Sequence, residues 1–206
     1  QKLYTCRKTI LGDICQSVSP YSSSTADMIR RAFTVGKVMK LCKSYRSTFE
    51  ITDFAQKIQI NEELEPVMRH GQSPKVLQFK SIEEEISGIG VLISIFKISI
   101  YRSLGIVCKT ETQAKALVQK LQMYFEDVYL LSSLSSTFVK GIVVTSAHMA
   151  KGLEFDEVIV PQVEDKNYNS AIDKSMLYVA VTRAMHKLTL TYSGARSEFI
   201  PESLGK

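Results

Sequence analysis

Apolar stretches along the chain alternate between the residue spacing of a strand and that of a helix, from one end to the other. Short apolar runs bounded by turn-forming residues predict strands, and apolar residues that recur every three or four positions predict amphipathic helices. The expected strands are 8–11, 38–41, 75–79, 104–108, 128–131, 142–144, 158–160 and 188–191. The expected helices are 26–33, one that is capped by Ser47 or Thr48, 82–100, 112–125 and 173–185. Alternating elements of this kind predict a layered α/β sheet and not a bundle or a sandwich.

The strands in the last third of the chain are apolar on both faces, as in 142–144 and 158–160. Strands of that composition are typical of a parallel sheet covered by helices on both sides. Segment 82–100 has the apolar spacing of one helix face, although its isoleucines would also suit strands. Segment 61–74 contains two prolines and is expected to be a loop. A frayed tail is expected from Gly194 onward, where the chain is polar.

Composition places the chain among ordinary globular proteins. Its 206 residues are 45% hydrophobic and 23% charged, which suits one domain, or one large domain plus a fragment, with a core that needs no metal or disulfide. The four cysteines are scattered without a C-x-x-C pair, which favours reduced thiols in the cytoplasm and argues against a metal site. The most apolar run, 86–100, falls short of the roughly 20 residues that cross a bilayer, so no membrane partner is expected.

The charge balance and the first residue add two expectations. A net charge of +5, from 26 basic and 21 acidic residues, permits contact with nucleic acid or nucleotide phosphate without requiring either. The chain begins with Gln1 and shows no charged segment leading into an apolar stretch. We therefore expect a piece of a longer protein that carries no signal peptide.

Four segments carry side chains suited to chemistry, and each also has a plain structural interpretation. Segment 145–156 follows a buried strand, where ligands gather in open α/β sheets, and offers a hydroxyl, an imidazole, an ammonium and a carboxylate. These groups could hold a sugar and a phosphate backbone, or could form a polar turn. Arg183, within an apolar helix, could reach an anion or pair with an acid. Segments 12–17 and 44–48 could bind a ligand, or could be a turn and a helix cap.

The order and combination of these segments are more specific than any one of them. Gly-Asp-x-x-Gln-Ser begins at Gly12, Tyr-Arg-Ser-Thr at Tyr45, Thr-x-x-His-x-x-Lys-Gly-Leu-Glu-Phe-Asp at Thr145 and Leu-Tyr-Val-Ala-x-Thr-Arg-Ala at Leu177. Together they resemble the motifs of superfamily 1 helicases of the UvrD/Rep type. The strand-end sequence 106–110 looks like a further motif of that family, so the resemblance covers nearly the whole chain.

The resemblance implies the second RecA-like motor lobe of an ATP-dependent DNA helicase. Residues 1–34 would be the end of the first lobe and a linking helix, 35–194 the second lobe, and 195–206 a flexible tail. The sequence contains no G-x-x-x-x-G-K-[ST] phosphate loop and no Asp-Glu Mg²⁺ motif, which in this family belong to the first lobe. ATP and Mg²⁺ would therefore act in the full-length protein, and the isolated fragment is expected to be inactive.

The same resemblance implies a role for individual residues. Gln16 would sense the γ-phosphate and the attacking water, while Arg46 and Arg183 would be arginine fingers that meet at one edge of the sheet and face solvent. Glu154 would bind the ribose, and Tyr178 would help to position its helix. The remaining assignments are Asp13 and Gly152 to the ATP site, and Thr145, His148, Lys109 and Tyr21 to nucleic acid.

Two departures from the family pattern bear on partners. The long helicases carry an aromatic pair with Trp after the Gln-Ser motif, whereas this chain has Tyr21 and no Trp. Residues 111–141 alone separate two motifs that flank a large subdomain in the long helicases, which resembles the compact helicase IV branch and its RNA-polymerase-associated relatives. The implied partners are single-stranded DNA and the first motor lobe, with RNA polymerase as an alternative target. A non-catalytic α/β module for an anionic ligand or a protein is the other alternative.

Overall fold

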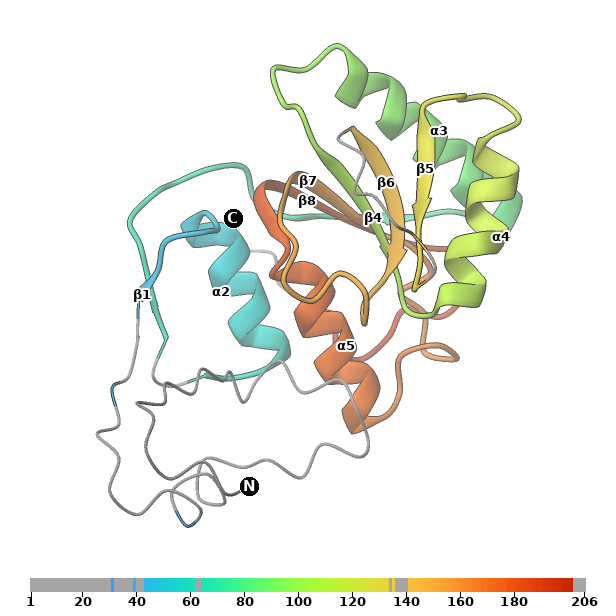
Figure 1. Ribbon diagram of the computed structural model, residues 1–206. Coiled ribbons are helices and arrows are strands. Elements are labelled where there is room, and N and C mark those ends of the chain that lie inside the picture. Colours follow the sequence, from blue (N-terminus) through green and yellow to red (C-terminus); the bar gives the residue numbers. More distant parts are fainter. Residues whose placement is uncertain are drawn as a thin grey trace, which may run out of the picture.

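The computed structural model describes Arg31, Met39 and residues 43–61, 64–133, 135 and 141–201 (Figure 1). The expected strand 8–11, nearly all of the helix 26–33 and most of the strand 38–41 lie outside these residues. Three candidate site residues, Asp13, Gln16 and Tyr21, lie outside them as well. The expected domain boundary at residue 34 also falls outside the described part of the chain.

Six parallel strands form the central sheet, in the spatial order β3-β8-β7-β4-β6-β5. All residues of β4 and β6 are buried, as expected for central strands covered on both faces. The parallel α/β sheet predicted from the sequence is therefore confirmed. The bounds of the strands are β3 Lys75–Gln78, β4 Leu104–Cys108, β5 Val128–Leu131, β6 Ile142–Ser146, β7 Phe155–Val160 and β8 Ala184–Tyr192.

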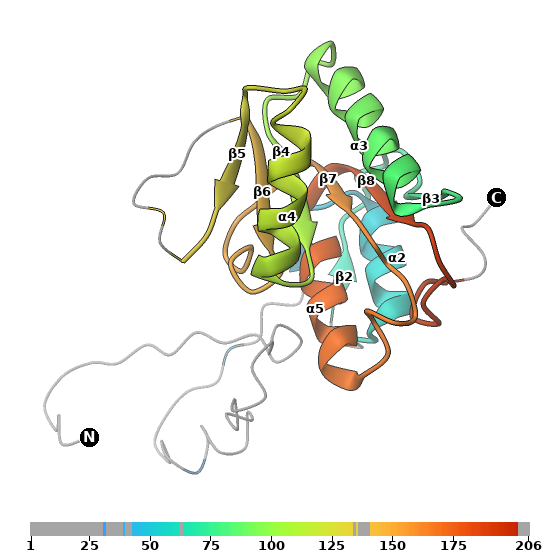
Figure 2. The same cartoon turned by 90° about the vertical axis from the view of Figure 1, so that its right-hand side faces the viewer.

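Two pairs of helices cover the sheet. In Figures 1 and 2, α2 (Phe49–Ile58) and α5 (Ala171–Val181) lie on one face, and α3 (Ile82–Lys97) and α4 (Glu111–Leu121) lie on the other. Each pair packs on the sheet through its own hydrophobic core, which joins the apolar faces of the helices to the strands. A short parallel pair, β1 (Lys43–Ser44) and β2 (Glu65–Pro66), forms a second, two-stranded sheet.

Helix starts follow from local sequence. Thr110 and Ser170 begin α4 and α5 with complete capping boxes, in which the hydroxyl accepts a backbone N–H and the side chain three residues later returns to the cap. Thr48 is the N-cap of α2, as expected from the sequence, but its hydroxyl makes no capping hydrogen bond. The start of α2 is therefore held by contacts from other segments, which matter for the site below.

The connection between α5 and β8 differs from the sequence prediction. The helix was expected over 173–185, but it ends at Val181 and the strand already begins at Ala184. The Thr182 backbone N–H turns back to the carbonyls of Tyr178 and Ala180, which closes the last turn of the helix. Arg183 consequently lies in a two-residue connection and not along a helix face.

Two other helices also end before the predicted residue. Helix α3 ends at Lys97, and the last apolar position of the expected helical pattern, Ile100, is exposed beyond its end. Helix α4 ends at Leu121, before the expected residue 125. Within the described residues, no helix is both long and apolar enough to span a bilayer.

The expected flexible tail is corrected for residues 195–201. Arg196 forms an isolated antiparallel bridge with Glu164, and the side chains of Ser197 and Ile200 are buried. The Ser197 hydroxyl donates to the carbonyl of Tyr168 over 2.7 Å. Residues 195–201 therefore pack against the connection between β7 and α5, although their composition is polar.

Candidate functional site

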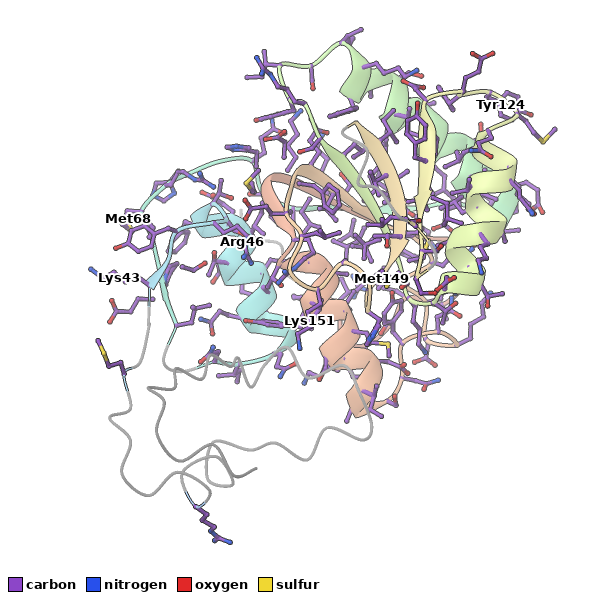
Figure 3. The ribbon with its side chains drawn as sticks, viewed as in Figure 1. Lys43, Arg46, Met68, Tyr124, Met149 and Lys151 are labelled. Carbon is purple, nitrogen blue, oxygen red and sulfur yellow. The ribbon has the colours of Figure 1, made fainter. Side chains whose placement is uncertain are left out.

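Arg46 lies in the turn between β1 and α2, close to the start of the helix (Figure 3). Its Nε donates to Oε2 of Glu154 over 3.1 Å, and Glu154 directly precedes β7. The two side chains are 36% and 56% exposed, so water screens their attraction and leaves it worth about 0–1 kcal/mol. Arg46 is thus a half-exposed cation whose present partner can be exchanged at little cost.

Arg183 has a very different environment, because it is only 1% exposed. Its Nε donates to the Val179 carbonyl over 3.0 Å, and its Nη1 donates to the Leu153 carbonyl over 3.2 Å. Its Nη2 donates to the Thr182 hydroxyl over 3.1 Å. The expectation that this guanidinium faces solvent is therefore wrong: main-chain carbonyls at the end of α5 and before β7 enclose it.

Three segments that are far apart in the sequence meet at the starts of β7 and β8. The Ser47 hydroxyl donates to the Ala184 carbonyl over 2.6 Å, and the Phe155 N–H donates to the Arg183 carbonyl over 2.9 Å. Arg46 contacts the side chain of Glu154, and Arg183 contacts the carbonyl of Leu153, the residue before Glu154. The structure therefore brings Arg46 and Arg183 to the same edge of the sheet through the segment 153–155.

The loop from β6 to β7 carries the remaining exposed candidates. Gly152 has a φ of +89°, a left-handed conformation that favours glycine, and this allows the chain to turn into β7. His148 and Lys151 are exposed, and Lys151 lies on the same side of the molecule as α2 and α5 (Figure 3). The Ala150 N–H donates to the Ser146 carbonyl over 2.8 Å and stabilises the start of the loop.

Thr145 and Tyr178 are both buried. The Thr145 hydroxyl donates to the Leu131 carbonyl over 2.9 Å and ties the end of β6 to β5. This arrangement leaves Thr145 no exposed surface, so the expectation of a direct nucleic-acid contact is corrected to a structural role. Tyr178 lies in the core between α5 and the sheet, a place that suits the expected role of positioning its helix.

Lys109 is engaged inside the protein. Its Nζ lies 2.5 Å from Oδ1 of Asp173 and donates to the Asn167 carbonyl, and its side chain is 22% exposed. Burial alone would raise the pKa of Asp173, but hydrogen bonds from Lys109, Ser170 and the Asn169 N–H outweigh it and hold the pKa below its usual value. Lys109 therefore forms an ion pair at the start of α5, and its nucleic-acid contact stays a prediction.

The Asp173→Asn variant tests this ion pair through the pH dependence of stability. Because the pKa of Asp173 is lower in the folded chain, its contribution to the free energy of unfolding is complete above the usual value of 3.8 and is lost as the pH falls below it. We expect the variant to be less stable by about 1–3 kcal/mol at neutral pH, with the difference shrinking in urea titrations as the pH falls below 3.8.

Asp127→Asn is the matched control, because the ion pair of Asp127 with Lys97 lies at the surface. It should lower the free energy of unfolding by less than about 1 kcal/mol. A difference between wild type and Asp173→Asn that stays constant over the whole pH range would contradict the role given to Asp173.

Two features of the site were not singled out from the sequence. Asp173 completes the capping box Ser170-x-x-Asp173, a pattern that a search for helix starts could have found. Arg69 contacts the main chain beside both Arg46 and Arg183, and no sequence pattern marks it. The described residues contain no group of three or more His, Cys, Asp or Glu side chains placed to hold a metal ion.

Comparisons with known proteins agree with this architecture. Residues 125–195 match the family model of the UvrD-like helicase C-terminal domain. DNA helicase II of Escherichia coli and that of Salmonella typhimurium are each 35% identical over 72 residues, which cover 30% of this chain and 10% of those proteins. The solved C-terminal domain of a possible DNA helicase from Lactobacillus plantarum WCFS1 has a TM-score of 0.67 and 30% identity, covering 78% of this chain and 96% of that domain. The chain thus spans a small part of the two DNA helicase II proteins and nearly all of the solved domain.

Proposed function

Because this chain belongs to the family of UvrD-like helicase C-terminal domains, we propose that it is the second motor lobe of an ATP-dependent DNA helicase. In this role the lobe closes on a nucleotide held mainly by the first lobe and grips single-stranded DNA. The parallel sheet with helices on both faces supplies the rigid frame that such a lobe needs. ATP hydrolysis, the DNA substrate and the contact with a first lobe are all parts of this proposal.

One observation carries the proposal: Arg46 and Arg183 converge on the segment 153–154 although many residues separate them. A guanidinium is permanently charged and can give two parallel hydrogen bonds to phosphate oxygens. Arginine fingers that stabilise the charge on a transferring phosphoryl group raise its transfer rate by roughly 10³ to 10⁵. Two arginines at one edge of the sheet are therefore better explained as the part of an ATP site that this lobe contributes than as structural salt-bridge residues.

The two arginines would act in different ways. Arg183 is held by the Val179 and Leu153 carbonyls, so it is already oriented and needs little reorganisation when charge develops nearby. Arg46 is half-exposed and would exchange Glu154 for a phosphate oxygen. Glu154, once released, can accept hydrogen bonds from ribose hydroxyls, so nucleotide binding would free both partners of the pair at once.

The other assignments complete this proposal. Gln16 would sense the γ-phosphate, and Asp13 would lie with it in the ATP site. Gly152 would let the loop between β6 and β7 approach the nucleotide. Mg²⁺ would be held by residues outside this chain and would neutralise phosphate charge. His148 offers an exposed imidazole to the nucleic-acid backbone, and Tyr21 would add an aromatic contact to a base.

The proposal predicts that the 206-residue chain alone does not hydrolyse ATP, whereas the full-length protein does so when single-stranded DNA is added. Without the backbone amides and lysine of a phosphate loop, most of the triphosphate charge stays uncompensated on this lobe. Phosphate release measured for both proteins, with and without DNA, checks this. Steady turnover by the purified chain above a mock preparation would contradict the division of labour, and a full-length protein without DNA-stimulated turnover would contradict the proposed function.

A further inference from the structure

The segment between β2 and β3 contains an arginine that touches the main chain next to both candidate arginine fingers. From this geometry we infer that Arg69 is a positioning residue, which fixes Arg46 relative to Arg183 so that both can reach one phosphate. This inference rests on the proposed function. It adds a residue that contacts neither phosphate nor sugar, and that acts through the placement of Arg46.

The guanidinium of Arg69 joins the two sides of the site directly. Its Nη2 donates to the carbonyl of Arg46 and, over 2.9 Å, to the carbonyl of Met185. Met185 lies two residues after Arg183, at the start of β8. One nitrogen with two hydrogens therefore bridges the turn that carries Arg46 and the strand that follows Arg183.

The main chain of Arg69 is anchored as well. Its carbonyl accepts the N–H of Phe49 over 2.8 Å, and Phe49 is the first residue of α2. That N–H is one of the donors that a helix start leaves without a partner inside the helix, and the Thr48 hydroxyl gives α2 no capping bond. Arg69 thus supplies an acceptor for the first backbone N–H of α2.

The residues after Arg69 fasten the same segment to α2. The Glu50 carboxylate lies 2.8 Å from Nδ1 of His70 through one oxygen, and accepts the Gly71 N–H over 2.8 Å through the other. A Cβ added at Gly71 would lie 2.6 Å from the side chain of Thr48, so the two segments are in close contact. The segment that carries Arg69 is therefore held against the start of α2.

The chemistry of the contact favours a role in positioning. Both acceptors of Arg69 are uncharged carbonyls, and a third cation at this edge of the sheet adds repulsion to that between Arg46 and Arg183. A neutral side chain could tie two carbonyls together without that repulsion. A cation at this place is advantageous where this edge of the sheet must bind the negatively charged phosphates of a nucleotide and keep Arg46 and Arg183 in fixed positions.

The test uses the full-length protein with Arg69→Ala, Arg69→Lys, Arg46→Ala and the Arg46→Ala/Arg69→Ala double variant. A displacement of about 1 Å at a catalytic group can lower a rate by roughly 10²-fold, so we expect Arg69→Ala to lower kcat for DNA-stimulated ATP hydrolysis by about 10-fold or more. KM for ATP should change by less than about 3-fold. In the Arg46→Ala background the same substitution should lower kcat by less than about 2-fold, because Arg69 acts through Arg46.

Two variants guard against a merely structural effect. Arg102 has an exposed side chain, and Arg102→Ala is the control that should leave kcat and the melting temperature unchanged. Arg69→Lys keeps the charge but lacks the planar fork, so it should fold normally and still lose several-fold in kcat. If Arg69→Ala does not fold, Arg69→Lys carries the test.

The outcomes separate this inference from the proposed function. A normal kcat in Arg69→Lys or Arg69→Ala beside a low kcat in Arg46→Ala would overturn the positioning role alone. An equal loss from Arg69→Ala with and without Arg46 would overturn it too, because Arg69 would then act on its own. A normal kcat in Arg46→Ala would refute the finger role of Arg46, and the positioning role with it.

Discussion

Replacing Arg46 by alanine in the full-length protein is expected to lower kcat for DNA-stimulated ATP hydrolysis by about 10²-fold or more. The guanidinium would stabilise charge that exists only while the phosphoryl group is transferred, so KM for ATP should change much less. The fold should tolerate the change, because the ion pair of Arg46 with Glu154 lies at the surface and contributes about 0–1 kcal/mol to stability. Steady-state kinetics with saturating single-stranded DNA, together with thermal melting, measure both effects.

Two variants sharpen the Arg46 experiment. Lys120→Ala removes an exposed cation from the last turn of α4 and should leave kcat unchanged. Arg46→Lys keeps the positive charge without the bidentate fork and should give an intermediate kcat. A kcat close to that of wild type in Arg46→Ala would show that Arg46 is a surface salt-bridge residue and not a finger.

The sequence predicted some strands closely, whereas β7 and β8 begin at Phe155 and Ala184, before the expected starts at 158 and 188. Strands β4 and β5 have the bounds expected from their apolar runs, although only β4 is buried along its whole length and β5 is an edge strand with Tyr129 exposed. The start of α5 moved only slightly, and Ser170 and Asp173 mark it in the sequence. Local patterns succeed where the determinants of an element lie within the element itself.

The candidate site was predicted only in outline, because its contacts are made between distant segments. The ordered motifs indicated that Arg46 and Arg183 share an edge, and they do. The helicase resemblance assigned Lys109 to nucleic acid and did not indicate its ion pair with Asp173, on a helix much later in the chain. The end of a strand predicts the position of a residue in the sheet, but its side-chain partner depends on which distant segments the fold brings beside it.

Arg69 shows a deeper reason for what the sequence cannot predict. Its partners are main-chain carbonyls, which every residue possesses, so no residue type elsewhere in the chain marks the contact. It also lies in segment 61–74, whose prolines and glycine predict a loop, although the short strand β2 forms within it. The burial of Arg183 has the same origin, because it donates to the main-chain carbonyls of Val179 in α5 and of Leu153 before β7.

The second large effect is expected at Arg183, where alanine should lower both stability and activity. Arg183 is 1% exposed, and its loss would leave the Leu153 carbonyl without this donor and open a cavity between α5 and β7. Each unpaired buried polar group costs about 1–3 kcal/mol, so we expect the free energy of unfolding to fall by about 2–5 kcal/mol. In the 206-residue chain this corresponds to a melting temperature lower by on the order of 10 °C.

The same substitution at two arginines therefore separates their roles. Thermal melting of the chain should show a large loss for Arg183→Ala and almost none for Arg46→Ala, because Arg183 is buried while the Arg46–Glu154 pair is exposed to water. At a temperature where both full-length variants are folded, each should still lose about 10²-fold in kcat, because the proposed function assigns both arginines to the charge that develops on the transferring phosphoryl group. If Arg183→Ala recovers a normal kcat once it is folded, the buried guanidinium serves only the connection between α5 and β8, and Arg46 would be the single finger of this lobe.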